Sequence, residues 1–233
     1  MSIWMHRVAR QLRLKLRRPS STRREDFIVS PTNADAVRAV DAWPAWYGGC
    51  LALIGPAGSG KSHLGLAWAA KAGAAVVSAG RSKTLDLGGL EGRPVLIEDA
   101  HRGVADEALF HLINRAGAPG GGLLLTAQIA PQAWTASLPD LRSRLNALPV
   151  AELPPPDDIV LEGLLRNFFR ERSISPADDL IPYLLRRIER SALSALDIVD
   201  RLEEAAVAEH KAVSRALARQ FFENEGETLD IGE

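Results

Sequence analysis

Eight residues, GPAGSGKS at 55–62, have the types and the spacing to hold a phosphate. They match G-x-x-x-x-G-K-[ST] in full, after an apolar run and before a helical pattern, which is the context that this motif requires. The glycines let the backbone wrap a phosphate, and the helix that follows adds its positive end. Lys61 supplies a cation for the β- and γ-phosphates, and Ser62 a hydroxyl for Mg²⁺. The candidate phosphate-contacting residues are Gly55, Pro56, Ala57, Gly58, Ser59, Gly60, Lys61, Ser62 and His63, the last expected to pack or cap rather than to catalyse.

Two carboxylates end another apolar run, VLIED at 95–99. By position, Glu98 is the acid that holds Mg²⁺ through water, and Asp99 is the acid that polarises an attacking water. The alternative is that Asp99 caps a helix while Glu98 is merely solvated. A further apolar run ends in Thr126 and Gln128, either of which is suited to sensing a γ-phosphate or only to closing a strand end.

The order of elements defines the fold class. Short apolar runs alternate with helical patterns, which predicts a five-stranded parallel α/β sheet covered by helices on both faces. The runs are at 50–55, 74–79, 94–99, 122–128 and 149–153, and the helical patterns are at 34–41 (capped by Asn33), 62–71, 105–116 and within 134–147. Three prolines at 154–156 then interrupt the chain. Only helical patterns follow, at 157–173, 176–190, 194–211 and 214–225.

The beginning of the chain differs from the rest in charge. Residues 1–24 hold eight Lys or Arg and no acid, in a chain of 233 residues whose net charge is −1. Such an arm is either a solvated tail, an organellar transit peptide or a segment that meets something negative. Within it, QLRLKL places Leu12, Leu14 and Leu16 on one side of an extended peptide. The predicted organisation is a basic arm at 1–24, a nucleotide-binding domain at 25–155, a helical domain at 156–225 and a frayed tail at 226–233.

Bulk composition excludes several classes of protein. The single cysteine, Cys50, permits no intramolecular disulfide, and one cysteine with five scattered histidines makes no zinc cluster. The chain contains no apolar run of 18 residues, so no membrane-spanning helix is expected.

Several segments together resemble the DnaA-related branch of the AAA+ ATPases. They are FIVSPTNADAV, LALIGPAGSGKSHLGLAWA, VLIEDA, LLLTAQIAPQAW and LPDLRSRLNALPVAELPPPDD, in the order and spacing of that branch. The resemblance implies an AAA+ P-loop NTPase domain plus an all-helical lid, with ADP or ATP and Mg²⁺ between them. It also implies that the segment with Phe27, Ile28 and Asn33 lies near the adenine.

The resemblance also suggests two sites for partners. Arg144, in SRL, matches the arginine finger that AAA+ proteins direct at a neighbour's nucleotide, with Arg142 as a nearby competitor. The residues Gln11, Leu12, Leu14 and Leu16 resemble the clamp-binding peptide of a member of this branch, with an extended peptide laid in an apolar groove. At the lid position that matches a nucleotide-contacting arginine the chain has Leu193, so Arg190, one turn earlier, substitutes or the contact is absent.

The resemblance implies a cytoplasmic, nucleoid- or replisome-associated bacterial negative regulator of chromosome replication initiation. Its partners would be the DNA polymerase sliding clamp (β subunit) and DnaA, with DNA met only indirectly or non-specifically, since the chain ends where the lid ends. Glu98 in place of Asp and the missing lid arginine imply weak intrinsic ATPase activity. The sequence leaves homo-oligomers open. The alternatives are a self-sufficient P-loop ATPase of helicase-loader type and a small-molecule kinase.

Overall fold

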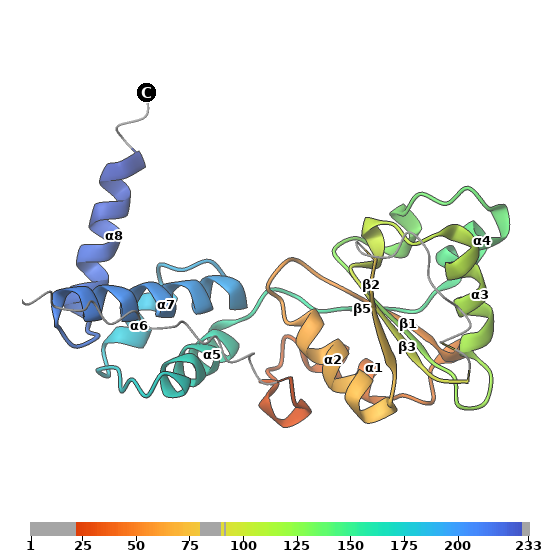
Figure 1. Cartoon of the computed structure of the whole chain (residues 1–233), viewed down its shortest axis with the longest axis horizontal. Helices are drawn as coiled ribbons and strands as arrows, with labels where there is room; N and C mark the ends of the chain where they lie inside the picture. Colours follow the sequence, from red (N-terminus) through yellow and green to blue (C-terminus); the bar gives the residue numbers. More distant parts are fainter. Residues whose placement is uncertain (1–21, 80–89, 91, 230–233) are drawn as a thin grey trace, which may run out of the picture.

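The computed structural model describes residues 22–79, 90 and 92–229, so the peptide at 11–16 lies outside the described residues. Figure 1 shows two parts along the long axis of the molecule, an α/β part and a helical part. Short 3₁₀ turns at 24–26, 47–49, 100–102 and 131–133 join larger elements. In the described ranges no helix is long and apolar enough to cross a membrane.

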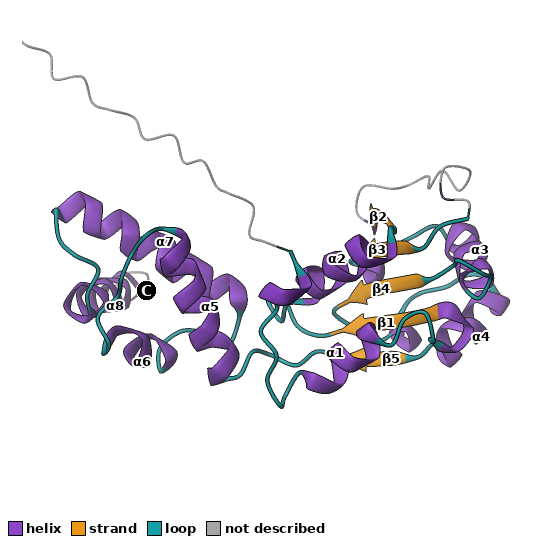
Figure 2. Ribbon diagram, turned by 90° about the horizontal axis from the view of Figure 1, so that it is seen from below, coloured by secondary structure: helices purple, strands orange, loops and turns teal. Residues whose placement is uncertain are grey.

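The α/β part is built on a parallel five-stranded sheet of order β2-β3-β4-β1-β5. All five predicted strands are present, and the predicted fold class is confirmed. The strands are β1 Cys50–Ile54, β2 Ala75–Ser78, β3 Val95–Glu98, β4 Leu123–Ala127 and β5 Val150–Glu152. Figure 2 shows that their carboxyl ends point toward the helical part.

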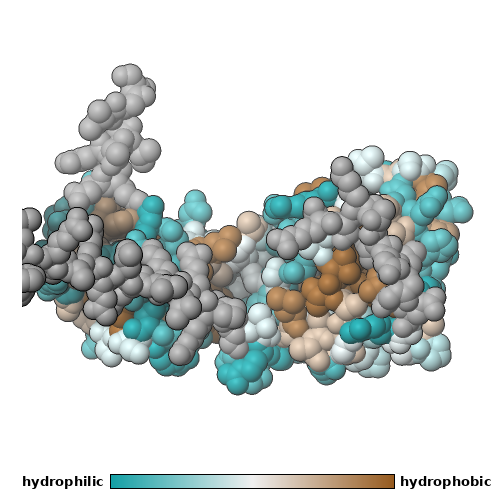
Figure 3. All heavy atoms as spheres, in the orientation of Figure 1, coloured by the Kyte–Doolittle hydropathy of each residue, from teal (hydrophilic) through white to brown (hydrophobic). Residues whose placement is uncertain are grey.

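Helices cover both faces of this sheet, because each central strand is apolar on both sides. Leu51 and Leu53 of β1 pack with α1 (Ala34–Asp41) and α2 (Lys61–Ala72), whereas Cys50 and Ala52 pack with α3 (Asp106–Ala116) and α4 (Pro139–Ala147). Pro139 occupies the first position of α4, where its missing N–H leaves no hydrogen bond unmade. The edge strand β2 leaves Val76 about half exposed, and Figure 3 shows apolar surface on this part of the molecule.

The helical part, called the lid below, has a core of its own. Its helices are α5 Asp158–Glu171, α6 Leu180–Leu185, α7 Ala192–Glu209 and α8 Arg215–Leu229. Phe169, Leu184 and Val199 are fully buried between them. The helix predicted over 176–190 is wrong in extent, because α6 covers only six residues and the chain turns before α7. Helix α8 continues to Leu229, past the predicted end near 225 and into the segment predicted to fray.

Candidate nucleotide-phosphate site

The P-loop, residues 55–62, follows β1 at the edge of the sheet where the strands end. Gly55, Gly58 and Gly60 have φ values of 158°, 72° and 101°, which L side chains rarely adopt. A Cβ at Gly55 would lie 2.1 Å from the carbonyl oxygen of Leu153 on the neighbouring segment. Only glycine therefore allows the loop to turn this tightly against the strand beside it.

Lys61 begins α2 and points back into the loop. It is only 7% exposed, and its Nζ donates to the carbonyl oxygens of Gly55 at 2.8 Å and Pro56 at 2.7 Å. Burial lowers the pKa of Lys61, and the charge of Asp99 acts in the opposite direction. The loop thus contains a partly desolvated ammonium held by two weak neutral acceptors, which an anion can replace.

The donor set fits a phosphate with a divalent cation. Ser59 Oγ is buried and has no hydrogen-bond partner among the described residues, so the loop contains an unused polar atom. Ser62 is exposed in the first turn of α2, where a hydroxyl is accessible to a cation. Within the described ranges no group of three His, Cys, Asp or Glu side chains forms a metal site by itself. Mg²⁺ would therefore share its ligands with the phosphates, as it commonly does.

The two acids differ in backbone conformation. Glu98 ends β3, whereas Asp99 has φ 54° and ψ 39°, in the left-handed region. The N–H of Asp99 donates to Thr126 Oγ1 at 3.1 Å, and Arg102 Nε lies 3.5 Å from Asp99 Oδ2. The Asp99 side chain makes no cap hydrogen bond to the turn that follows, so the capping alternative is not what is observed.

Thr126 and Gln128, the two candidate sensors, have different surroundings. Thr126 is fully buried and its hydroxyl accepts from the backbone of Asp99, which connects the ends of β3 and β4. Gln128 is exposed, and its backbone N–H donates to His101 Nδ1 at 3.4 Å. Of the two, only Thr126 contacts the acidic pair.

The segment before α1 packs against the P-loop. The Phe27 ring is buried 5.3 Å from the His63 ring in an edge-on contact, and it lies against Gly60. His63 Nε2 is 2.9 Å from the carbonyl oxygen of Arg23. His63 therefore packs, as its position suggested, while Ile28 lies against Gly163 of the lid helix α5.

Asn33 does not cap α1 with its side chain, so the predicted cap is wrong. Its amide Nδ2 donates to the carbonyl oxygen of Ile28 at 3.0 Å, and its Oδ1 accepts from the N–H of Ser30 at 2.9 Å. The side chain turns back because the loop 28–30 offers it both a donor and an acceptor. Asn33 thereby fixes the segment beside the P-loop.

The lid contacts the P-loop through the start of α7. The N–H of Ala192 donates to the carbonyl oxygen of Gly58 at 2.9 Å, and Ser191 Oγ caps the helix by accepting from Leu193. Leu193 is 61% exposed. Arg190 forms an ion pair with Asp158 at 2.8 Å. Sequence reasoning missed the contact with Gly58, although a Ser before a helical pattern is a cap signal.

Arg144 lies at the opposite edge of the sheet. It is exposed near the end of α4, with its Cζ 5.3 Å from the centroid of the Phe110 ring. Burial raises the pKa of Cys50 to about 12, and the nearby charge of Arg144 opposes that shift. Cys50 begins β1, whereas the P-loop follows the end of β1, so Arg144 is separated from the P-loop by the length of the strand. Figure 2 shows α4 at the end of the molecule away from the lid.

Arg142, the competitor of Arg144, is partly buried and bonded to the backbone of its own chain. Its Nη1 donates to the carbonyl oxygen of Trp134 at 2.6 Å and to that of Gln132 at 3.3 Å. Two backbone acceptors fix it against the segment before α4. Of the two arginines, Arg144 is the one whose guanidinium is presented to the surface.

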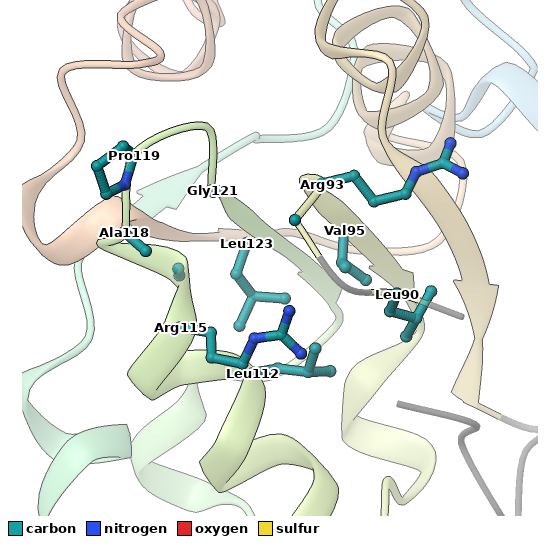
Figure 4. Close-up of a pocket in the computed structure, with 12 residues that line it drawn as sticks. Leu90, Arg93, Val95, Leu112, Arg115, Ala118, Pro119, Gly121 and Leu123 are labelled. Carbon is teal, nitrogen blue, oxygen red and sulfur yellow. The ribbon is translucent and has the colours of Figure 1, made fainter. Parts of the chain in front are cut away.

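A small pocket also lies at the edge of the sheet where the strands begin. It has a volume of about 60 Å³ between α3 and the starts of β3 and β4, lined by Val95, Leu112 and Leu123 among others. Figure 4 shows Arg115 lying along it and Arg93 pointing away, and Arg93 Nη2 donates to the carbonyl oxygen of Gly73 at 3.0 Å. Ligand pockets commonly measure about 300–1,000 Å³, so this pocket is too small for a nucleotide.

A parallel sheet of this order, with a P-loop after β1, acids at the end of β3 and a helical lid, is the fold of an AAA+ P-loop NTPase. Domain III of the replication initiation protein DnaA from Thermotoga maritima matches with a TM-score of 0.72 and 18% identity, over 88% of this chain and 97% of that one. AMPPCP-bound DnaA from Aquifex aeolicus matches with a TM-score of 0.59 and 16% identity, over 77% of this chain and 64% of that one. The T. maritima RuvB Holliday junction branch migration motor matches with a TM-score of 0.67 and 16% identity, over 87% and 72%.

Sequence comparison adds a shorter match. An uncharacterized protein of Haemophilus influenzae is 31% identical over 101 residues, which are 43% of this chain. The chain spans 44% of the length of that curated relative. No protein-family model matches the chain.

Proposed function

We propose that the protein is a nucleotide-bound negative regulator of replication initiation, acting as Hda does in the regulatory inactivation of DnaA. It binds ADP or ATP with Mg²⁺, docks on the DNA-loaded sliding clamp and presents Arg144 to the ATP of a DnaA neighbour. DnaA then hydrolyses its own ATP. Support comes from the DnaA-like fold and from the sequence resemblance.

The position of Arg144 is the observation that carries this proposal. A cation at the start of the strands is far from the P-loop at their ends, so within one chain the two do not meet at one phosphate. Arg144 is exposed and rests on the Phe110 ring, a contact that uses none of its N–H donors. A guanidinium so placed is suited to the nucleotide of a second molecule.

The chain's own nucleotide serves mainly to hold its two parts together. The P-loop supplies Lys61, Ser62 and the loop amides for the phosphates, and the acids Glu98 and Asp99 lie on the Mg²⁺ side. A bound Mg²⁺ would neutralise phosphate charge. Arg190 is paired with Asp158, and Leu193 offers no charge, which supports slow hydrolysis by the chain itself.

Clamp docking is assigned to the peptide Gln11, Leu12, Leu14 and Leu16, which lies outside the described residues. In an extended peptide the three leucines enter an apolar groove and the glutamine adds a directional hydrogen bond. The replisome-associated, cytoplasmic location of the protein follows from this docking.

A reconstituted reaction tests the proposal. It contains DnaA–ATP, sliding clamp loaded on DNA and this protein, and the release of phosphate is measured. We expect hydrolysis to rise only when all components are present, and Leu14→Ala with Leu16→Ala to abolish the rise while nucleotide binding is retained. Hydrolysis of equal size without DnaA would instead indicate a self-sufficient ATPase.

A further inference from the structure

Three arginines gather around one tyrosine on the lid, at a hollow that the proposed function does not use. Arg187 follows α6, and Arg215 and Arg219 begin α8. Together with Tyr183, Phe222 and Glu223 they line a hollow of about 340 Å³. We call Arg187, Arg215 and Arg219 the lid arginine cluster.

Tyr183 fixes two of these guanidinium groups. Tyr183 is 4% exposed, and the Cζ of Arg187 lies 3.8 Å and that of Arg215 5.3 Å from the centroid of its ring. Cation–π contacts of this kind hold a guanidinium in place without using its N–H donors. Both arginines remain exposed to solvent. The lid therefore presents two fixed guanidinium groups beside one another, each with its N–H donors exposed.

The acids near the cluster leave it with a net positive charge. Glu223 pairs with Arg219 at 2.7 Å, and Asp179 lies 3.7 Å from Arg215, and both pairs are exposed to solvent. Exposed pairs of this type contribute little, so the arginines stay available. In the described part of the chain, Arg187 has no ion-pair partner. The lid as a whole holds more acidic than basic residues, so the cluster is not a consequence of its composition.

We propose that the lid arginine cluster binds the phosphate backbone of DNA. A planar guanidinium matches phosphate oxygens with two donors, and positioned arginines lose less side-chain freedom on binding than free ones. Guanidinium groups that contact phosphate carry no sequence information, so this binding should be independent of base sequence. This contact goes beyond the proposed function, in which the protein reaches DNA only through the clamp.

The test uses the full chain and a duplex oligonucleotide, without clamp or DnaA. Affinity is measured by fluorescence anisotropy between about 50 and 200 mM salt, where phosphate contacts are strongly salt-dependent. The variant is Arg187→Gln with Arg215→Gln, which keeps an apolar stem over Tyr183. The control, Arg166→Gln with Arg170→Gln, removes two exposed arginines from α5, where they bond to Glu162 and Asn167. The basic arm at 1–24 is common to all proteins compared.

The salt slope is the slope of the logarithm of the binding constant against the logarithm of the salt concentration. We expect its magnitude to fall by roughly 0.9 for each phosphate contact removed, so by about two in the cluster variant. The control should change much less. Arg187→Lys with Arg215→Lys keeps both charges and should retain most of the slope. Equal losses in variant and control, or no loss in either, would overturn the proposal. So would equal weakening of binding to poly-glutamate, which would assign the cluster to acidic proteins. Unchanged thermal unfolding of the variant excludes a folding defect, and neither result depends on DnaA stimulation.

Discussion

Two cations stand at opposite edges of the same sheet, and their surroundings differ. Lys61, at the ends of the strands, is buried and bonded to two carbonyl oxygens of its own loop. Arg144, at the beginning of the strands, is exposed and rests on the Phe110 ring. The backbone around Lys61 has already formed a cradle, whereas nothing around Arg144 in the described chain forms one. The carboxyl ends of the strands, around Lys61, are suited to hold a ligand. The amino ends, around Arg144, are suited to complete a site on another molecule.

Of the changes to nucleotide binding and stability, the largest effect is expected at the P-loop. Lys61→Ala removes the only cation inside the described loop and should weaken ADP and ATP binding roughly 100-fold, since bonds to charged groups contribute about 1.5–3 kcal/mol. Isothermal titration calorimetry measures the affinity for each nucleotide. Lys71→Ala, at the exposed end of the same helix, is the matched control and should bind normally. Equal loss in both variants would contradict the role of Lys61.

A smaller effect is expected where the lid meets this edge. A Cβ at Gly58 would lie 2.0 Å from Ser191 Oγ, so Gly58→Ala forces the P-loop and α7 apart. The left-handed φ alone costs about 1–2 kcal/mol for alanine, and the clash adds to it. Ser191→Gly in the Gly58→Ala background removes the clash and should recover the stability that the clash cost. The lost Ser cap itself costs only a few tenths of a kcal/mol when Gly replaces it.

Denaturant unfolding and nucleotide affinity of the four proteins in this double-mutant cycle give the coupling. Additive effects of Gly58→Ala and Ser191→Gly would show that α7 does not touch the P-loop in solution.

The smallest effect concerns Asp157, which joins the lid to the segment before α1. It caps α5 by accepting from the N–H of Val160, and it accepts from Thr32 Oγ1 at 2.6 Å. Although burial raises the pKa of Asp157, these hydrogen bonds lower it on balance below its ordinary value of 3.8. Asp157→Ala should lower the free energy of unfolding by about 1 kcal/mol.

The pH dependence follows from the sign of that shift. A carboxylate with a lowered pKa stabilises the fold above its unfolded pKa, and this contribution is lost as pH falls through the folded value. The difference between Asp157→Ala and the unaltered protein should therefore shrink below about pH 4. Asp178→Ala, at an exposed position of the lid, is the control. A pH-independent difference would contradict the hydrogen-bonded carboxylate.

The sheet and the P-loop were predictable because both depend on local pattern. Strands buried on both faces are continuous apolar runs, as in LLL of β4, and the glycine spacing of the P-loop fixes its backbone wherever it occurs. The acids at 98–99 follow from the same logic, since the carboxyl ends of parallel strands share one edge.

The features that the sequence did not predict depend on contacts between segments far apart in the sequence. Asn33 is a good cap by type, but the loop at 28–30 provides better-placed partners. The pattern at 176–190 is helical by periodicity, but the chain leaves the helix after Leu185, and Ser191 then caps the start of α7 at the P-loop. Local propensity does not show where a turn must occur for a lid to meet a loop.

The role of Arg144 is tested by measuring ATP hydrolysis by DnaA in the presence of DNA-loaded clamp and either the unaltered protein or Arg144→Ala. We expect the variant to bind nucleotide normally, because Arg144 lies at the other end of the strands from the P-loop. It should also bind the clamp normally, because the proposed clamp-binding peptide at 11–16 is unaltered. Its stimulation of DnaA should fall by roughly 10³-fold, the lower range for arginine fingers of GTPases. Arg166→Ala, an exposed arginine on α5, should stimulate normally. Full stimulation by Arg144→Ala would contradict the assignment of this edge to a partner's nucleotide.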